Sequence, residues 1–337
     1  MSRGGVSYAA KSPSFSLGAR RKNLSIRGYI VTGQFFKKMG AAAASALALS
    51  PIMASAQEIG AVGRGHPEPG QFHLQESVTP IMDSIVAFHD GILMWTISLI
   101  VVFVLALLVI VVVRFNAKAN PVPARFTHNT MVEIVWTVVP ILVLVVIAIP
   151  SFGVLSDQMT IPDGERKYLG ANVFSMGEVD VPAPTLTVKA SGEQWYWNYE
   201  YVDQGVAFDS NMLNEDEIAA TKPGQPRLLA VNNELVVPVN TTVRMQITAS
   251  PSGVIHAFAV PSFGIKVDAV PGRLNETWFN SRETGMFYGQ CSELCGKDHA
   301  FMPIGVRVVT AEEFETFIAA FEESRDYAVA VATLPAL

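Results

Sequence analysis

Cysteine is scarce in this chain, whose 337 residues include only Cys291 and Cys295. A single pair cannot build a framework of several disulfides, and no Cys-x-x-Cys-His motif is present for covalent attachment of haem c. The paired cysteine knuckles common in structural zinc sites are also missing. The thiol chemistry of the chain is therefore confined to one short stretch.

Acidic residues are absent from the first 56 positions, which carry eight lysines or arginines. An apolar run from Gly40 to Met53 then ends in Ala54-Ser55-Ala56, a small-residue pattern that a signal peptidase cleaves. We therefore interpret residues 1–56 as a signal peptide. A retained membrane anchor is the alternative, although the apolar run is short for a membrane span.

Charged residues of both signs are few, at 16% of the chain, and 30 acidic residues outnumber 24 basic ones. Removing the eight basic residues of the predicted signal peptide from the 24 leaves 16 against 30, a net charge of −14. An exported domain with this charge repels nucleic acid and attracts basic proteins. We expect no nucleic-acid partner.

Two apolar runs, at about 92–113 and 135–152, lack charged residues and are long enough to cross a bilayer. The connection between them, 114–128, carries three basic residues and no acid, so the positive-inside rule places it in the cytoplasm and both ends of the mature chain outside. A buried hairpin in a soluble protein is the alternative. It would need a polar face, which these runs do not have.

A different pattern begins at Thr185, where apolar and polar residues alternate with the period of a half-buried strand. Short strand-like segments recur at 195–201, 235–239, 243–247, 254–260, 277–279 and 304–309, between turns rich in proline and glycine. This pattern predicts a β-sandwich or barrel. Thr310 and Glu313 form a capping-box signature before a C-terminal amphipathic helix.

The two cysteines lie in the stretch YGQCSELCGKDHAFMP, residues 288–303, together with His299 and Met302. Two thiolates, an imidazole and a thioether are soft ligands that suit copper, and His256 is a further imidazole within reach of a folded sheet. A disulfide and a structural zinc site remain alternatives. A spacing of four residues closes only a very small disulfide loop, and Met302 would have no role with zinc.

Three further motifs accompany this loop: Gln194-Trp195-Tyr196-Trp197, Ala259-Val260-Pro261-Ser262-Phe263-Gly264 and Pro271-Gly272-Arg273-Leu274-Asn275. With them, residues from about 81 to 309 resemble subunit II of the haem–copper cytochrome c oxidases. The resemblance implies a membrane α-helical hairpin of two transmembrane helices, followed by an all-β cupredoxin-like Greek-key barrel.

The resemblance also implies a dinuclear copper A centre. Cys291 and Cys295 would bridge two copper ions, His256 and His299 would each bind one of them, and Met302 would be a weak ligand. The backbone carbonyl of Glu293 would be the other weak ligand. Its carboxylate would help to bind magnesium or manganese at the contact with subunit I.

Electron and proton transfer would use other residues. By the same resemblance, Trp195 receives electrons from cytochrome c, and Glu133 lies near the mouth of a proton pathway into subunit I. From position alone, Glu133 is equally an ordinary interfacial acid. Expected docking carboxylates are Glu200, Asp203 and Asp209, with Glu234 as a possible substitute for acids that some relatives carry where this chain has Asn232 and Gly253.

The resulting prediction is the subunit that passes electrons from cytochrome c to haem in subunit I, where oxygen is reduced to water and protons are translocated. It would lie in a bacterial inner membrane, with the copper domain on the periplasmic side.

Three other classes of protein fit the sequence less well. A quinol oxidase subunit would lack the copper ligands, and a tethered copper carrier would not need the tryptophan motif or the acidic surface. A nitrous oxide reductase would lack the hairpin. The predicted parts are a signal peptide (1–56), an N-terminal periplasmic segment (57–90), the hairpin (91–153), a linker (154–184), the copper A domain (185–310), and a C-terminal helix and tail (311–337).

Overall fold

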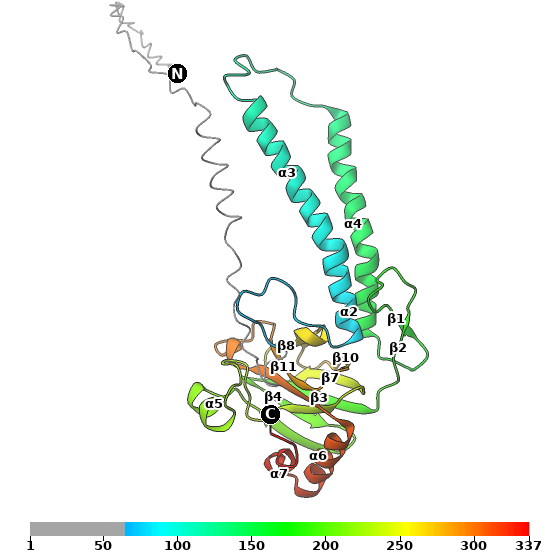
Figure 1. Ribbon diagram of the computed structural model, residues 1–337, viewed down its shortest axis with the longest axis vertical. Coiled ribbons are helices and arrows are strands. Elements are labelled where there is room, and N and C mark those ends of the chain that lie inside the picture. Colours follow the sequence, from blue (N-terminus) through cyan, green and yellow to red (C-terminus); the bar gives the residue numbers. More distant parts are fainter. Residues whose placement is uncertain (1–64, 337) are drawn as a thin grey trace, which may run out of the picture. The chain divides into compact units, whose positions relative to one another are not determined.

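Residues 65–336 are described by a computed structural model, so the predicted signal peptide lies outside the described part of the chain. The first long helical stretch runs through α2 (Pro80–Val86), a π-helical segment η1 (Ala87–Leu93) and α3 (Met94–Arg114). The second is α4 (Thr130–Met159), and both are shown in Figure 1. Their apolar side chains are almost all exposed, as expected for helices whose solvent is lipid. The predicted two-helix hairpin is confirmed.

Helix α4 continues to Met159, past the expected end of the hairpin at residue 153, and its last turn is bonded to the β domain. The buried carboxylate of Asp157 accepts hydrogen bonds from the Leu169 amide (2.7 Å) and from Arg166 (2.9 Å). The Trp278 indole donates to the carbonyl of Asp157 at 2.8 Å. The segment predicted to be a linker, residues 154–184, also contains a short hairpin of β1 (Lys167–Tyr168) and β2 (Val179–Asp180). It therefore anchors the helix instead of merely connecting it.

Ten strands form two five-stranded sheets. Parallel pairs β3–β7 and β6–β12 join strands that are far apart in the chain, and the other neighbours in both sheets are antiparallel. The predicted strands are all present, whereas β5, β9 and β11 were not expected. The strands of the first sheet lie in the order β10 (Asn275–Asn280), β7 (Thr242–Ala249), β3 (Leu186–Glu193), β4 (Tyr196–Tyr201) and β5 (Val206–Ser210). Those of the second sheet lie in the order β6 (Leu235–Pro238), β12 (Pro303–Val309), β11 (Gly285–Cys291), β8 (His256–Val260) and β9 (Ile265–Ala269).

The inward side chains of the two sheets form one core that includes Trp197, Met245 and Phe258, all fully buried. The C-terminal helix α6 (Ala311–Ser324) extends this core with buried phenylalanines. Its predicted capping box is confirmed, because the Thr310 and Glu313 side chains each accept a backbone N–H from the other residue. The remaining short helices are α5 (Glu215–Thr221), η2 (Pro261–Phe263), η3 (His299–Phe301) and α7 (Tyr327–Val331).

Candidate metal centre

The cysteine loop connects the end of β11 to the start of β12 and contains η3. Antiparallel pairing of β11 with β8 sets Cys291 opposite Phe258 and so brings His256, the first residue of β8, to the loop. The two strands approach closely at Gly289, where a Cβ atom would lie 2.0 Å from the carbonyl oxygen of Ala259. Only glycine leaves room for this approach, which joins the distant histidine to the cysteines.

The five predicted ligand side chains lie together. The two Sγ atoms are 3.8 Å apart, and His256 Nδ1 lies 3.8 Å from Cys291 Sγ. Cys295 Sγ is 3.6 Å from both His299 Nδ1 and Met302 Sδ. Four of these side chains are buried, and His299 is partly buried. Both thiols are free, so the disulfide alternative is not formed.

The environment of these groups suits a soft cation. Burial and the neighbouring Cys291 sulfur raise the pKa of Cys295 to about 12, while burial and then the charge of His299 lower the pKa of His256. Nε2 of the fully buried His256 has no hydrogen-bond partner among the described residues. Burial disfavours the charged thiolate at this site, and a bound metal ion would supply the positive charge that stabilises it.

Glu293 follows Cys291 by two residues, and its carbonyl oxygen accepts from Cys291 Sγ at 3.3 Å. This oxygen therefore lies next to a proposed bridging sulfur. The residue itself is exposed. Its two expected roles, as a carbonyl ligand and as a carboxylate for magnesium or manganese, stay predictions.

Both tryptophans of the Gln-Trp-Tyr-Trp motif donate to the backbone of the loop. The half-buried Trp195 indole donates to the carbonyl of Cys295 at 3.0 Å, and the buried Trp197 indole donates to that of Met302 at 3.3 Å. Trp197 also packs edge-on against the His256 ring. Its role in holding the loop was not predicted. The signal available in the sequence was its place in the same motif as Trp195.

The role of Gly192 at the site was also not predicted from the sequence. It pairs with Trp197 across β3 and β4, and a Cβ atom on it would come within 2.8 Å of the His256 ring. A glycine here therefore leaves the space in which the imidazole lies. A side chain would push His256 away from the cysteines.

The predicted docking carboxylates have different surroundings. Glu200 lies 3.4 Å from the Lys189 ammonium, Asp209 accepts from the Asn198 amide at 2.8 Å, and Asp203 is exposed. These docking roles stay predictions.

Glu133 lies in the first turn of α4, where its carboxylate accepts the N–H of Asn129 at 3.2 Å. This contact caps the helix, as expected for a carboxylate near a helix N-terminus. The proton-pathway role remains a separate prediction.

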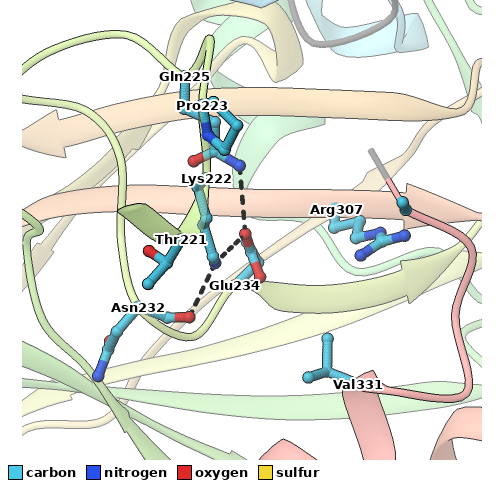
Figure 2. A pocket seen from close by; sticks show the side chains of 9 residues that line it. Thr221, Lys222, Pro223, Gln225, Asn232, Glu234, Arg307 and Val331 are labelled. Atoms are coloured by element: carbon cyan, nitrogen blue, oxygen red, sulfur yellow. Dashed lines mark hydrogen bonds and ion pairs between the residues drawn. The ribbon is translucent and has the colours of Figure 1, made fainter. Parts of the chain in front are cut away.

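Glu234 does not offer a docking charge, contrary to expectation. Its side chain is only 2% exposed and is paired with the Lys222 ammonium, and Gln225 lies 3.5 Å away (Figure 2). The Tyr327 hydroxyl donates to the Glu234 backbone carbonyl at 2.8 Å. A buried, neutralised carboxylate cannot compensate at the surface for Asn232, so this prediction was wrong.

Comparison with known proteins identifies two matching family models. One, described as "Cytochrome C oxidase subunit II, periplasmic domain", matches residues 186–309. The other, described as "Cytochrome C oxidase subunit II, transmembrane domain", matches residues 67–154.

Relatives match over most of their length. A probable cytochrome c oxidase subunit 2 from Rickettsia bellii is 47% identical over 254 residues, which cover 75% of this chain and 85% of the relative. The cytochrome c oxidase subunit 2 of Oenothera berteroana is 44% identical over 257 residues, covering 74% of this chain and 90% of the relative. The crystal structure of the periplasmic domain of cytochrome oxidase subunit II from Bradyrhizobium japonicum is 56% identical, with coverage of 43% of this chain and 99% of that structure and a TM-score of 0.39.

Proposed function

This chain belongs to the cytochrome c oxidase subunit II family, and we infer that within the oxidase it is the subunit that receives electrons from cytochrome c. It is a membrane-bound part of that enzyme, with two spanning helices and a domain of the periplasmic type. We place it in a bacterial inner membrane. The electrons would continue to haem in subunit I, where oxygen is reduced to water and protons are translocated.

The observation that supports this role is the gathering of five soft ligand side chains in one cluster, four of them buried and His299 partly buried. We propose that it holds dinuclear copper A, with Cys291 and Cys295 as bridging ligands and His256 and His299 as terminal ones. The weak ligands would be Met302 and the Glu293 carbonyl. Copper bound by these residues would supply one-electron chemistry, with the change in charge shared between the metals and the two thiolates. Strands β8, β11 and β12 contribute rigidity, since they hold both ends of the ligand set.

Trp195 is the proposed electron acceptor. Its indole is partly exposed and donates a hydrogen bond to the carbonyl of Cys295, so a short path of bonds leads from the surface to a proposed copper ligand. Docking acids at Glu200, Asp203 and Asp209 would mainly set the rate of association with cytochrome c and its salt dependence.

Two acids are proposed to work at the contact with subunit I. Glu133 would lie near the mouth of a proton pathway, and the Glu293 carboxylate would share a magnesium or manganese ion with that subunit. The exposure of Glu293, two residues after Cys291, supports the second role, because a carboxylate that has no side-chain partner among the described residues can bind an ion held by two chains.

Copper content and electron paramagnetic resonance test the proposal. Full-length protein in detergent, loaded with copper, should hold two copper ions per chain that share one unpaired electron. The shared hyperfine pattern should be lost in Cys291→Ser and retained in Ser292→Ala, a change at the exposed neighbour. One copper per chain, or zinc with a silent spectrum, would contradict the dinuclear centre and favour a tethered carrier or a structural metal site.

A further inference from the structure

Lys297 is a cationic residue at the proposed point of electron transfer. It follows Cys295 by two residues, and its Nζ lies 5.1 Å from the centre of the Trp195 ring. This distance is within the range of cation–π attraction. The lysine side chain is 74% exposed, so its charge faces solvent and any docked partner.

The loop holds this arrangement in place from several sides. The Trp195 indole donates to the Cys295 carbonyl, and Gly296 lies so close that a Cβ atom on it would be 3.0 Å from the ring. The Asp298 carboxylate lies 3.5 Å from the Lys297 ammonium. The ammonium therefore has two neighbours that attract it, the Trp195 ring and the Asp298 carboxylate.

The surface around Trp195 is consequently not uniformly acidic. Asp298 is matched by Lys297, and Glu200, on the strand β4 that follows Trp195, is matched by Lys189. A donor with lysines on every side of its haem edge would bring one of them against the Lys297 ammonium. Like charges placed opposite each other slow association and select against that partner.

We propose that Lys297 determines the choice of electron donor, by requiring a carboxylate on the donor surface that meets the Trp195 ring. The proposal rests on the proposed function of Trp195 as electron acceptor. The favoured partner is a cytochrome c that carries an acidic side chain among the basic ones near its exposed haem edge. Lys297 acts on docking, and the electron still passes through the indole.

The test uses the complete oxidase with Lys297→Met, which keeps most of the apolar stem and removes the charge. We would measure kcat/KM with two soluble cytochromes c, one with only lysines around the haem edge and one with a carboxylate there. A single exposed charge pair at contact distance in water is equivalent to about a fivefold change. We therefore expect kcat/KM to rise by about this factor with the basic donor and to fall by about this factor with the other. Both changes should disappear at high ionic strength.

Lys167→Met is the matched control, because Lys167 is also an exposed lysine paired with an aspartate, Asp180, but lies on β1 and has no contact with Trp195. It should leave both values unchanged. Equal changes with both donors in Lys297→Met would show that the lysine only supports the indole, and no change would show that its charge is not felt. Either result would overturn the proposal.

Measurements on the wild type distinguish failure of the Lys297 proposal from failure of the proposed electron-accepting function on which it rests. Reduction of the copper pair by a small uncharged reductant should be the same in wild type and Lys297→Met. If the wild type holds the copper pair and neither cytochrome reduces it, the proposed electron-accepting function fails and the donor selection falls with it. If both cytochromes reduce it with no preference that Lys297→Met alters, only the donor selection fails.

Discussion

Two buried clusters of polar side chains lie in the same β domain, and they differ in how far they satisfy themselves. The Lys222 ammonium donates to the carbonyls of Val231 and Asn232, each at 2.8 Å, and to Glu234, so all three of its protons have acceptors. In the cysteine cluster the sulfurs lie 3.6–3.8 Å from one another and from the histidine nitrogens. His256 Nε2 has no partner among the described residues.

The difference distinguishes a structural cluster from a binding one. Buried polar groups are normally paired, because an unpaired one costs free energy of folding. In the Lys222–Glu234 cluster both charges are paired by protein groups and need no ligand, and the neutral Oε1 atom of Gln225 is the member without a partner among the described residues. The cysteine cluster pairs its polar groups only weakly, through long contacts between soft atoms, and this is the behaviour expected where a metal ion completes the site.

Among these variants, Cys291→Ser should show the largest difference between its effect on copper binding and its effect on stability. This change removes a proposed bridging sulfur, so copper binding should weaken by more than about a hundredfold and oxidase activity should be lost. The thermal unfolding temperature of the metal-free protein should move little, because a serine hydroxyl can also donate to the Glu293 carbonyl and the other two contacts of the sulfur are 3.8 Å long. Metal analysis and calorimetry measure the two effects. A large loss of metal-free stability would mean that this cluster, too, is structural.

For Glu234→Ala we expect the opposite result, a loss of stability without a change in copper binding. Removing the carboxylate leaves the Lys222 ammonium, whose side chain is about four-fifths buried, without its charged partner, which should lower the free energy of unfolding by about 3–5 kcal/mol. The copper spectrum should remain unchanged in the folded protein. Replacing both residues, as in Lys222→Met with Glu234→Leu, should recover much of the loss, because no unpaired charge remains. Chemical denaturation measures all three variants, and an equal loss in the double variant would contradict this explanation.

A smaller effect is expected where the protein supports the cysteine cluster indirectly. Trp197→Phe removes the N–H that donates to the Met302 carbonyl, and copper affinity should fall by about tenfold. Trp278→Phe is the matched control, since it removes an indole bond of similar kind to Asp157, at the joint with α4. Competition with a copper chelator measures the affinity. Equal losses in the two variants would assign the effect to general destabilisation.

The smallest effect should follow Glu215→Gln, which breaks an exposed ion pair with Arg227. Both side chains are about two-thirds exposed, so water and salt already screen their attraction. The stability should change by less than about 1 kcal/mol, compared with the larger loss in Glu234→Ala. Chemical denaturation of Glu215→Gln and Glu234→Ala under identical conditions compares the two losses of stability. A comparable loss in both variants would show that burial is not the source of the difference.

Features that depend on local sequence were predictable. The apolar runs indicated both spanning helices, alternation indicated seven of the ten strands in the two large sheets, and Thr310 with Glu313 indicated the start of α6. Four proposed copper ligands were also visible, because Cys291, Cys295, His299 and Met302 occur within one loop. In each case the residues that interact lie close along the chain, so their spacing is sufficient to show the pattern.

Tertiary structure decided what depends on distant parts of the chain. Strand pairing brings His256 to Cys291, and close packing at Gly192 and Gly289 makes the space for it. Glu234 looked like a surface acid and is buried with Lys222, while Lys297 meets Trp195 from a distant segment. These outcomes follow from the register and packing of the sheets. Residue types and local spacing determined which chemistry is available to this protein, and long-range packing determined which side chains carry it out.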